Sequence, residues 1–284
     1  MTNLIEQINF TDLGISSKLC VAIKSLGWDY PSPIQIKAIP AALTGQDLVG
    51  VAQTGTGKTG AFLIPCIDKI EMGGLQTLVL CPTRELAQQV CEDAVALLAR
   101  SGGKSAGRAA SIYGGVGYGP QIAALEGGVE IITATPGRFL DHMRKGLVNL
   151  NGLTTLIFDE ADRMLDMGFR PQIEDILKGA RSKRQTMLFS ATMPNGVHDL
   201  ASRITKDPIW IEIAKSGTKA DGITEVVYSV KPNMKTSLLL HLLENPEWTQ
   251  VLVFTRTKAG AALLQKALSN QDISTEALHS DLAM

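Results

Sequence analysis

Three carboxylates stand close together where an apolar segment of the chain ends. The run Leu156-Ile157-Phe158 is followed directly by Asp159 and Glu160, and Asp162 comes two residues later. A solvated acidic turn would explain this cluster, and so would a cation site at the end of a buried strand. Carboxylate oxygens suit Mg²⁺, which keeps several water molecules and takes few protein ligands. The choice depends on what other chemistry the chain carries.

A glycine-rich loop supplies a candidate for that chemistry. The segment AQTGTGKTG, at 52–60, follows the apolar run LVGVA and precedes the helical pattern AFLIPCI. Gly55 and Gly57 allow the backbone to curl with its N–H groups facing inward, and the following helix presents its positive N-terminus to phosphate. We expect Lys58 to reach the terminal phosphates of a nucleotide and the Thr59 hydroxyl to bind Mg²⁺. The strict phosphate-loop pattern starts with glycine and this segment starts with alanine, so a glycine-rich turn with a chance Lys-Thr pair is the alternative.

The loop and the acids together favour a nucleotide site. A phosphate loop needs a partner for its Mg²⁺, usually an acid at the carboxyl end of a neighbouring buried strand. Asp159 fits that place, and Glu160 beside it is placed to polarise the water that attacks the γ-phosphate. We therefore predict a metal-and-base pair rather than a solvated turn.

The elements that must position these residues are short apolar runs alternating with helical patterns. The runs are continuously apolar, as strands buried on both faces are. Helical patterns cover 14–26, the segment that opens at 31, and 84–99. Repeated strand–helix units of this length predict a parallel α/β sheet with right-handed crossovers. The predicted strands are 47–52, 77–81, 109–113, 129–134, 153–158 and 185–190.

A polar segment, KSGTKADG at 215–222, marks a predicted domain boundary. We expect a first domain over 1–214, a linker over 215–222 and a partial second domain over 223–284. The strand–helix rhythm restarts after the linker, but the remaining chain is too short to close a second sheet of the same size. The elements predicted there are strands 223–230, 250–255 and 273–280 and helices 234–243 and 257–269.

Composition excludes several classes of protein. With 27 basic and 28 acidic residues among 284, the net charge of −1 argues against a wholly cationic surface, although a local basic patch would suffice for nucleic acid. No apolar run reaches the roughly 18 residues needed to span a bilayer, and the first residues lack a signal-peptide pattern. We interpret the cysteines as reduced core residues of a cytosolic protein, because their spacing suits no metal site. They are Cys20, Cys66, Cys81 and Cys91.

The segment DEAD, at 159–162, resembles the signature of the DEAD-box RNA helicases. Phe10, Gly27-Trp28 and PSPIQ at 31–35 resemble the family's Q motif, although Trp28 and Ser32 stand where tyrosine and threonine are common. Further segments resemble other family motifs, and they follow in the family's order along almost the whole chain. They are PTRELAQQ (82–89), GG (114–115), TPGR (135–138), SAT (190–192), VLVFTRT (251–257) and HSD (279–281).

The resemblance implies a fold and an activity. The expected fold is a RecA-like P-loop domain with a parallel sheet and flanking helices, followed by an incomplete second RecA-like α/β domain. The expected activity is ATP-dependent RNA unwinding, with ATP and Mg²⁺ as cofactors and RNA held through its backbone with little sequence specificity. The resemblance also suggests a cytoplasmic monomer with no membrane association.

The resemblance also implies roles for single residues. Gln35 would hydrogen-bond the adenine edge while Phe10 packs against the ring, and Lys58, Asp159 and Glu160 would be catalytic. Thr59 and Asp159 would bind Mg²⁺. The full nucleotide-binding set is Phe10, Gln35, Ala52, Gln53, Thr54, Gly55, Thr56, Gly57, Lys58 and Thr59. The RNA-binding set is Thr83, Arg84, Gly115, Thr135, Gly137 and Arg138. The set that couples the two sites is Asp162, Ser190 and Thr192.

Several of these residues have an alternative interpretation in which they bind no ligand. Gln35 would otherwise be a surface residue at a helix start, Arg84 and Arg138 ordinary solvated arginines, and SAT a strand-end turn. The family's second domain carries catalytic arginines in an H-R-x-G-R-x-x-R-type segment that this sequence lacks. We therefore expect a chain truncated within that domain, with slow ATP hydrolysis, no unwinding and a labile 223–284 segment.

Two other functions are compatible with the sequence. An ATP-gated RNA clamp would bind both ligands without needing hydrolysis, and a DNA helicase or another P-loop ATPase would share the phosphate loop. The intact set Lys58, Thr59, Asp159 and Glu160 favours an enzyme, while PSPIQ and PTREL disfavour the DNA helicase. The sequence does not specify the RNA, the pathway (ribosome assembly or decay) or protein partners.

Overall fold

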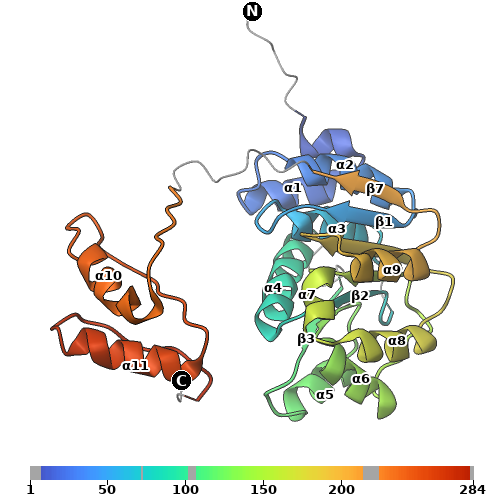
Figure 1. Cartoon of the computed structure of the whole chain (residues 1–284). Coiled ribbons are helices and arrows are strands. Elements are labelled where there is room, and N and C mark those ends of the chain that lie inside the picture. Colours follow the sequence, from blue (N-terminus) through green and yellow to red (C-terminus); the bar gives the residue numbers. More distant parts are fainter. Residues whose placement is uncertain (1–7, 72, 102–106, 214–223, 282–284) are drawn as a thin grey trace, which may run out of the picture. The chain divides into compact units, whose positions relative to one another are not determined.

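The structure is a computed structural model that describes residues 8–71, 73–101, 107–213 and 224–281. The chain divides into two compact units, Met1–Thr218 and Lys219–Met284, and this division falls within the predicted linker. Figure 1 shows both units, each of which is described by itself below.

The first unit is built on a seven-stranded parallel sheet in the order β3-β4-β2-β5-β6-β1-β7. The six strands predicted from continuous apolar runs are confirmed, and β7 was missed. In β7 the side chain of Ile211 is buried while Trp210 and Glu212 are exposed, an alternation typical of a strand with one solvated face. The strands are β1 (Leu48–Val51), β2 (Thr77–Leu80), β3 (Ala109–Ile112), β4 (Ile131–Ala134), β5 (Thr155–Phe158), β6 (Gln185–Ser190) and β7 (Ile209–Glu212).

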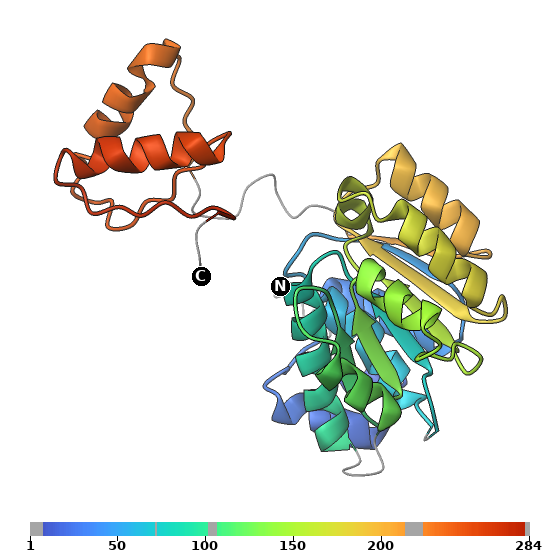
Figure 2. The same ribbon diagram turned by 90° about the horizontal axis from the view of Figure 1, so that it is seen from below.

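Helices cover both faces of this sheet (Figure 2). Neighbouring residues of one strand enter different cores: Leu48 packs with the cluster under α1–α4, and Val49 packs with the cluster under α6–α9. This two-sided burial explains why the strands are continuously apolar. The helices are η1 (Phe10–Leu13), α1 (Ser17–Ser25), α2 (Pro33–Leu43), α3 (Lys58–Asp68), α4 (Arg84–Ser101), α5 (Gly119–Glu126), α6 (Pro136–Arg144), α7 (Ala161–Asp166), α8 (Arg170–Gly179) and α9 (Asn195–Ile204).

The strand order decides which loops meet at the carboxyl edge. Strand β6 lies between β1 and β5, with Val51 paired to Ser190 and Phe158 paired to Leu188. The glycine-rich loop after β1 and the acids after β5 therefore flank the end of β6. Strands β2, β4 and β3 continue the sheet on the other side of β5, so the loops after them share the same edge.

The second unit contains helices but, over residues 224–281, no strand. The predicted helices are confirmed as α10 (Lys235–Leu242) and α11 (Lys258–Ser269), with the short helix η3 (Pro232–Met234) before them. The predicted strands 223–230, 250–255 and 273–280 are wrong for the residues that the structure describes. A strand needs a neighbour for its backbone hydrogen bonds, and these segments instead leave Val227, Leu252 and Phe254 largely exposed.

A candidate nucleotide and nucleic-acid site

The glycine-rich loop joins β1 to α3 and closes tightly on itself. Gly55 and Gly57 have φ angles of 82° and 89°, in the left-handed region that glycine adopts without strain. Lys58 opens α3 and is buried, and its Nζ donates a hydrogen bond of 2.7 Å to the carbonyl of Ala52. The lysine thus lies across the loop, where it can exchange this carbonyl for a phosphate oxygen.

Gln35 links the start of α2 to the same loop. Its Oε1 accepts a hydrogen bond of 2.9 Å from the backbone N–H of Ser32, and its Nε2 donates one of 3.0 Å to the carbonyl of Gly57. An amide group has two N–H donors and two acceptor lone pairs, so one of each remains for an adenine edge. A Cβ added to Gly60 would lie 2.6 Å from this Nε2, so the close approach requires glycine there.

A pocket of about 500 Å³, called the nucleotide pocket below, is lined by most of the residues predicted to bind nucleotide. Gln35, six consecutive residues of the loop from Thr54 to Thr59, and both Asp159 and Glu160 line it. Phe10 is not among the lining residues, because its ring is buried in the core beneath α1–α4. Trp28 and Tyr30 supply the aromatic rings of the pocket wall instead.

The two acids after β5 differ in environment and backbone. Asp159 is 2% exposed, and its backbone N–H donates to Leu80 of β2 at 2.9 Å. Glu160 caps α7 with φ 53° and ψ 53°, a left-handed conformation that costs a residue with a Cβ about 1 kcal/mol or more. Its N–H donates to Oδ1 of Asp159, and its Oε2 lies 3.3 Å from Nη1 of Arg163. The turn therefore directs the two carboxylates differently.

Burial is the largest influence on the pKa of Asp159. Desolvation raises the pKa of its carboxyl from 3.8 to about 6, with Lys58 lowering it and Glu160 raising it further. A buried carboxylate with a raised pKa favours a cation as a neighbour. Thr59 lines the same pocket and offers a hydroxyl oxygen. The carboxylate of Asp159 and the hydroxyl of Thr59 are oxygen ligands, which suit a hard cation whose remaining ligands are phosphate and water.

The three residues predicted to couple the sites contact one another. Oγ of Ser190 accepts from the N–H of Asp162 at 3.3 Å and donates to the carbonyl of Thr192 at 2.7 Å. Oδ2 of Asp162 accepts from the N–H and the hydroxyl of Thr192, at 2.9 and 2.7 Å. Burial acts to raise the pKa of Asp162, but these hydrogen bonds outweigh it and the pKa lies below its usual value. The loops after β5 and β6 are thereby joined.

The residues predicted to bind RNA follow β2, β3 and β4, which are adjacent in the sheet. Thr83 Oγ1 accepts from the N–H of Leu86 in the first turn of α4, and Thr135 caps α6. Gly115 has φ 85°, and a Cβ added there would lie 3.6 Å from Nη1 of Arg84. The structure thus brings the segments after β2 and β3 together, and it places Gly137 and Arg138 in the first turn of α6.

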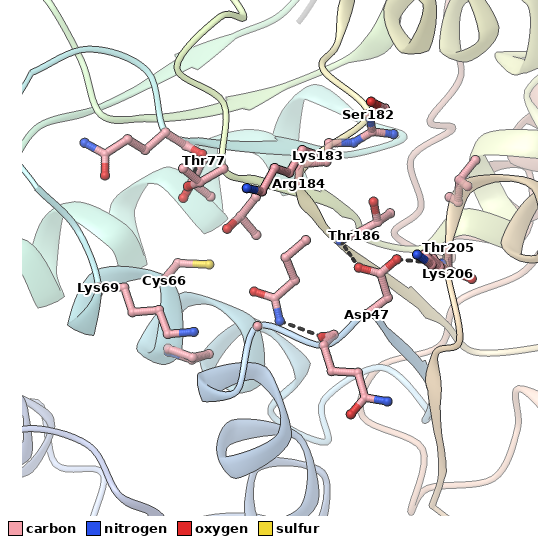
Figure 3. Close-up of a pocket in the computed structure, with 18 of the residues that line it drawn as sticks. Asp47, Cys66, Lys69, Thr77, Ser182, Lys183, Arg184, Thr186, Thr205 and Lys206 are labelled. Carbon is pink, nitrogen blue, oxygen red and sulfur yellow. Dashed lines mark hydrogen bonds between the residues drawn. The ribbon is translucent and has the colours of Figure 1, made fainter.

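A larger pocket, of about 1250 Å³, opens at the amino ends of the strands, opposite the site. Figure 3 shows side chains that line it. Its lining is polar and carries both charges, and it includes none of the predicted site residues. Asp47 is buried there and accepts hydrogen bonds of 2.7 Å from the backbone N–H groups of Thr186 and Lys206. This carboxylate joins three segments of the fold, which is a structural role.

The cysteines are free thiols within the first unit. Burial raises the pKa of Cys66 to about 12 and that of Cys81 well above its usual value. Both thiols stay protonated at neutral pH and act as small core residues. Among the described residues, no helix has both the length and the apolarity to cross a bilayer.

Sequence reasoning missed several residues of the pocket wall. Tyr30, Gln89 and Asp93 line the nucleotide pocket, and burial with the nearby Glu92 raises the pKa of Asp93. Gln89 is the last residue of the PTRELAQQ segment. Asp93 lies one helical turn beyond it on α4, and that spacing is the signal that could have identified both.

Comparisons with known proteins identify the family of the chain. Residues 32–200 match the DEAD/DEAH box helicase family. The chain is 40% identical over 277 residues to the DEAD-box ATP-dependent RNA helicase CshA of Bacillus subtilis, covering 97% of this chain and 55% of that protein. It is 38% identical over 278 residues to the ATP-dependent RNA helicase DeaD of Escherichia coli, covering 97% and 44%. The chain thus spans about half the length of these relatives.

A solved structure extends the likeness to three dimensions. The crystal structure of a DEAD box protein from the hyperthermophile Methanococcus jannaschii is 37% identical, with a TM-score of 0.68 over 97% of this chain and 74% of that one. The expected RecA-like α/β fold is confirmed for the seven-stranded unit. The family match covers more than half of the sequence, and it spans the phosphate loop and both acids. The chain belongs to the DEAD/DEAH box helicase family.

Proposed function

We propose that this chain is the part of an ATP-dependent RNA helicase that binds ATP with Mg²⁺ and holds RNA along its backbone. One observation carries the proposal: both predicted sites share a single sheet edge. The residues proposed to bind the phosphates and Mg²⁺ follow β1 and β5, and the RNA residues follow β2, β3 and β4. Strands β5 and β2 are neighbours, so a change at one site has a short route to the other.

The residues of the pocket have complementary tasks in this proposal. The N–H groups of the 54–59 loop and Lys58 bind the terminal phosphates, and Thr59 and Asp159 would hold the metal. Bound Mg²⁺ would neutralise charge on the phosphates. Among the described residues no group of three or more His, Cys, Asp or Glu could hold a metal, which suits an ion shared with phosphate and water. Glu160 orients and deprotonates the attacking water.

The organisation of the chain forms part of the proposal. Residues 1–214 would be the nucleotide-binding domain, 215–222 a linker and 223–284 part of a second RecA-like domain. We propose a monomer that makes mainly phosphate and sugar contacts, which give little sequence specificity. The free cysteines support a cytoplasmic location.

An ATP-gated RNA clamp is the competing function. It would use the same pocket and the same RNA residues, and it would not depend on Glu160 as a base. The strained left-handed turn that places Glu160 beside Asp159 favours the enzyme, because such strain is typically retained where function needs it.

The test is ATP turnover with and without single-stranded RNA. It should be measured on this chain and on a form extended through a complete second domain, each with a Glu160→Gln control. We expect weak turnover from residues 1–284 and RNA-stimulated turnover from the extended form, abolished by Glu160→Gln. If the extended form binds RNA and ATP but never turns over, the clamp is correct and Glu160 is not the base.

A further inference from the structure

Tyr118 lies along one face of α6, the helix that begins with the TPGR segment. The guanidinium carbon of Arg138 lies 4.1 Å from the centre of the Tyr118 ring, and Nζ of Lys145 lies 3.7 Å from it. The Tyr118 hydroxyl donates to Asp141 at 3.3 Å. These three partners are spaced by three, four and seven residues, which places them on one helical face. A single ring thus contacts two turns of α6.

Gln121 adds a buried polar connection to the same arginine. Its Nε2 donates to the carbonyl of Tyr113 at 2.9 Å, which turns its Oε1 toward α6. That oxygen accepts from Nη1 of Arg138 at 3.4 Å and lies 3.1 Å from Nε2 of His142. Because this oxygen accepts, the buried His142 carries its proton on Nε2. Only one orientation of the Gln121 amide therefore forms hydrogen bonds with Tyr113, Arg138 and His142 together.

Arg138 is held by the segment 116–121, which includes the end of the loop after β3 and the first turn of α5. Besides the ring of Tyr118 and the amide of Gln121, its Nη2 donates to the carbonyl of Val116 at 3.0 Å. A guanidinium has five N–H donors, and these bonds use one on each terminal nitrogen. The remaining donors are available to an anion, and the conformational entropy of the side chain has already been lost.

We propose that Tyr118 and Gln121 are positioning residues that fix Arg138 for a phosphate of the RNA backbone. This inference rests on the proposed function, in which Arg138 contacts RNA. The Tyr118 ring contacts the cations of both Arg138 and Lys145, and two cations held by one ring gain from binding the same anion. The loop 114–121 and the start of α6 then form one preorganised phosphate-binding surface.

The test is a double-mutant cycle on RNA binding by the complete chain. The probe is a short fluorescein-labelled single-stranded RNA, titrated at low salt with a nonhydrolysable ATP analogue present. Tyr118→Leu should weaken binding by about three- to tenfold in the unmodified chain. In an Arg138→Ala background it should weaken binding less than about 1.5-fold, because the group that it positions is absent.

Two controls separate positioning from folding. Tyr118→Phe keeps the ring and loses only the hydroxyl bond to Asp141, so it should bind RNA like the unmodified chain. Binding of the nucleotide analogue alone should be unchanged in every variant, since Tyr118 lies outside the nucleotide pocket.

The outcomes distinguish the positioning role of Tyr118 from the RNA-binding role of Arg138. Equal losses from Tyr118→Leu in both backgrounds, or a loss in Tyr118→Phe as large as in Tyr118→Leu, would overturn the positioning role alone. Unaltered RNA binding in Arg138→Ala, or no RNA binding by the unmodified chain, would overturn the RNA role of Arg138 and this inference with it.

Discussion

Replacing Asp159 with asparagine should stabilise the first unit while removing the proposed metal ligand. The side chain is 2% exposed, and burial raises the pKa of its carboxyl from 3.8 to about 6. The folded state therefore binds this proton more tightly than the unfolded chain, so ionisation at neutral pH costs stability. A difference of about two pH units corresponds to about 3 kcal/mol. Asparagine keeps the acceptor for the N–H of Glu160 and does not ionise.

The assay is urea unfolding of both forms across a pH series, in a buffer without Mg²⁺ and nucleotide. The free energy of unfolding of Asp159→Asn should exceed that of the unmodified chain by about 3 kcal/mol at pH 7.5 and by roughly half as much at pH 5. The contribution of Asp159 to the stability of the unmodified chain falls as pH rises from about 4 through about 6, because the folded state must then release the proton of this carboxyl. Other acids titrate in both forms and cancel in the difference.

Asp166→Asn provides the matched control, since it removes the same charge from an exposed position on α7. Its free energy of unfolding should stay within about 0.5 kcal/mol of the unmodified chain at both pH values. An Asp159→Asn difference that is equal at pH 5 and pH 7.5, or that has the opposite sign, would refute the reasoning. Either result would mean that the pocket stabilises the charged carboxylate more than burial destabilises it.

Three further substitutions test separate parts of the structure. Gln35→Ala should weaken ATP binding by about tenfold and reduce the preference for ATP over GTP, measured by calorimetry, because the amide that also bonds Gly57 is lost. Asp47→Ala should lower the free energy of unfolding by about 2 to 4 kcal/mol, in urea, with ATP affinity unchanged, because the buried N–H of Thr186 and the part-buried N–H of Lys206 lose their acceptor. Ser190→Ala should leave ATP binding within about twofold but reduce RNA stimulation of turnover at least about fivefold in the extended form, because it breaks the link to Asp162.

The sheet was predictable because burial on both faces leaves a plain signal in the sequence. Six strands with no exposed face appear as unbroken apolar runs, and each run lies where the structure has a strand. Strand β7 was not predicted because its side chains alternate between buried and exposed, with Trp210 exposed at the edge of the sheet. The three strands predicted after residue 222 failed for another reason. Their apolar patterns are those of strands, but over 224–281 the structure provides no neighbouring strand to pair with.

The site was predictable to the extent that its chemistry lies in contiguous segments. Glycine spacing and the Lys-Thr pair identify the phosphate loop, and adjacent acids identify the turn after β5. Contacts that depend on strand order could not be read in the same way. Nothing near Gln121 in the sequence indicates that its amide reaches Arg138, because β4 and the start of α6 intervene. Phe10 is buried in the core, and its packing against an adenine ring stays a prediction.

The turn after β5 is where the two halves of the sheet edge meet. On one side, Asp159 lines the nucleotide pocket and its N–H bonds to β2, the strand that leads to Thr83 and Arg84. On the other side, Asp162 bonds to the loop after β6, the strand that pairs with β1. Glu160 stands between them in a strained conformation, held by bonds on both sides. A ligand that moved either neighbour would change the cost of that conformation. In the proposed function, nucleotide and RNA would therefore influence each other through Asp159, Glu160 and Asp162 rather than through a long path.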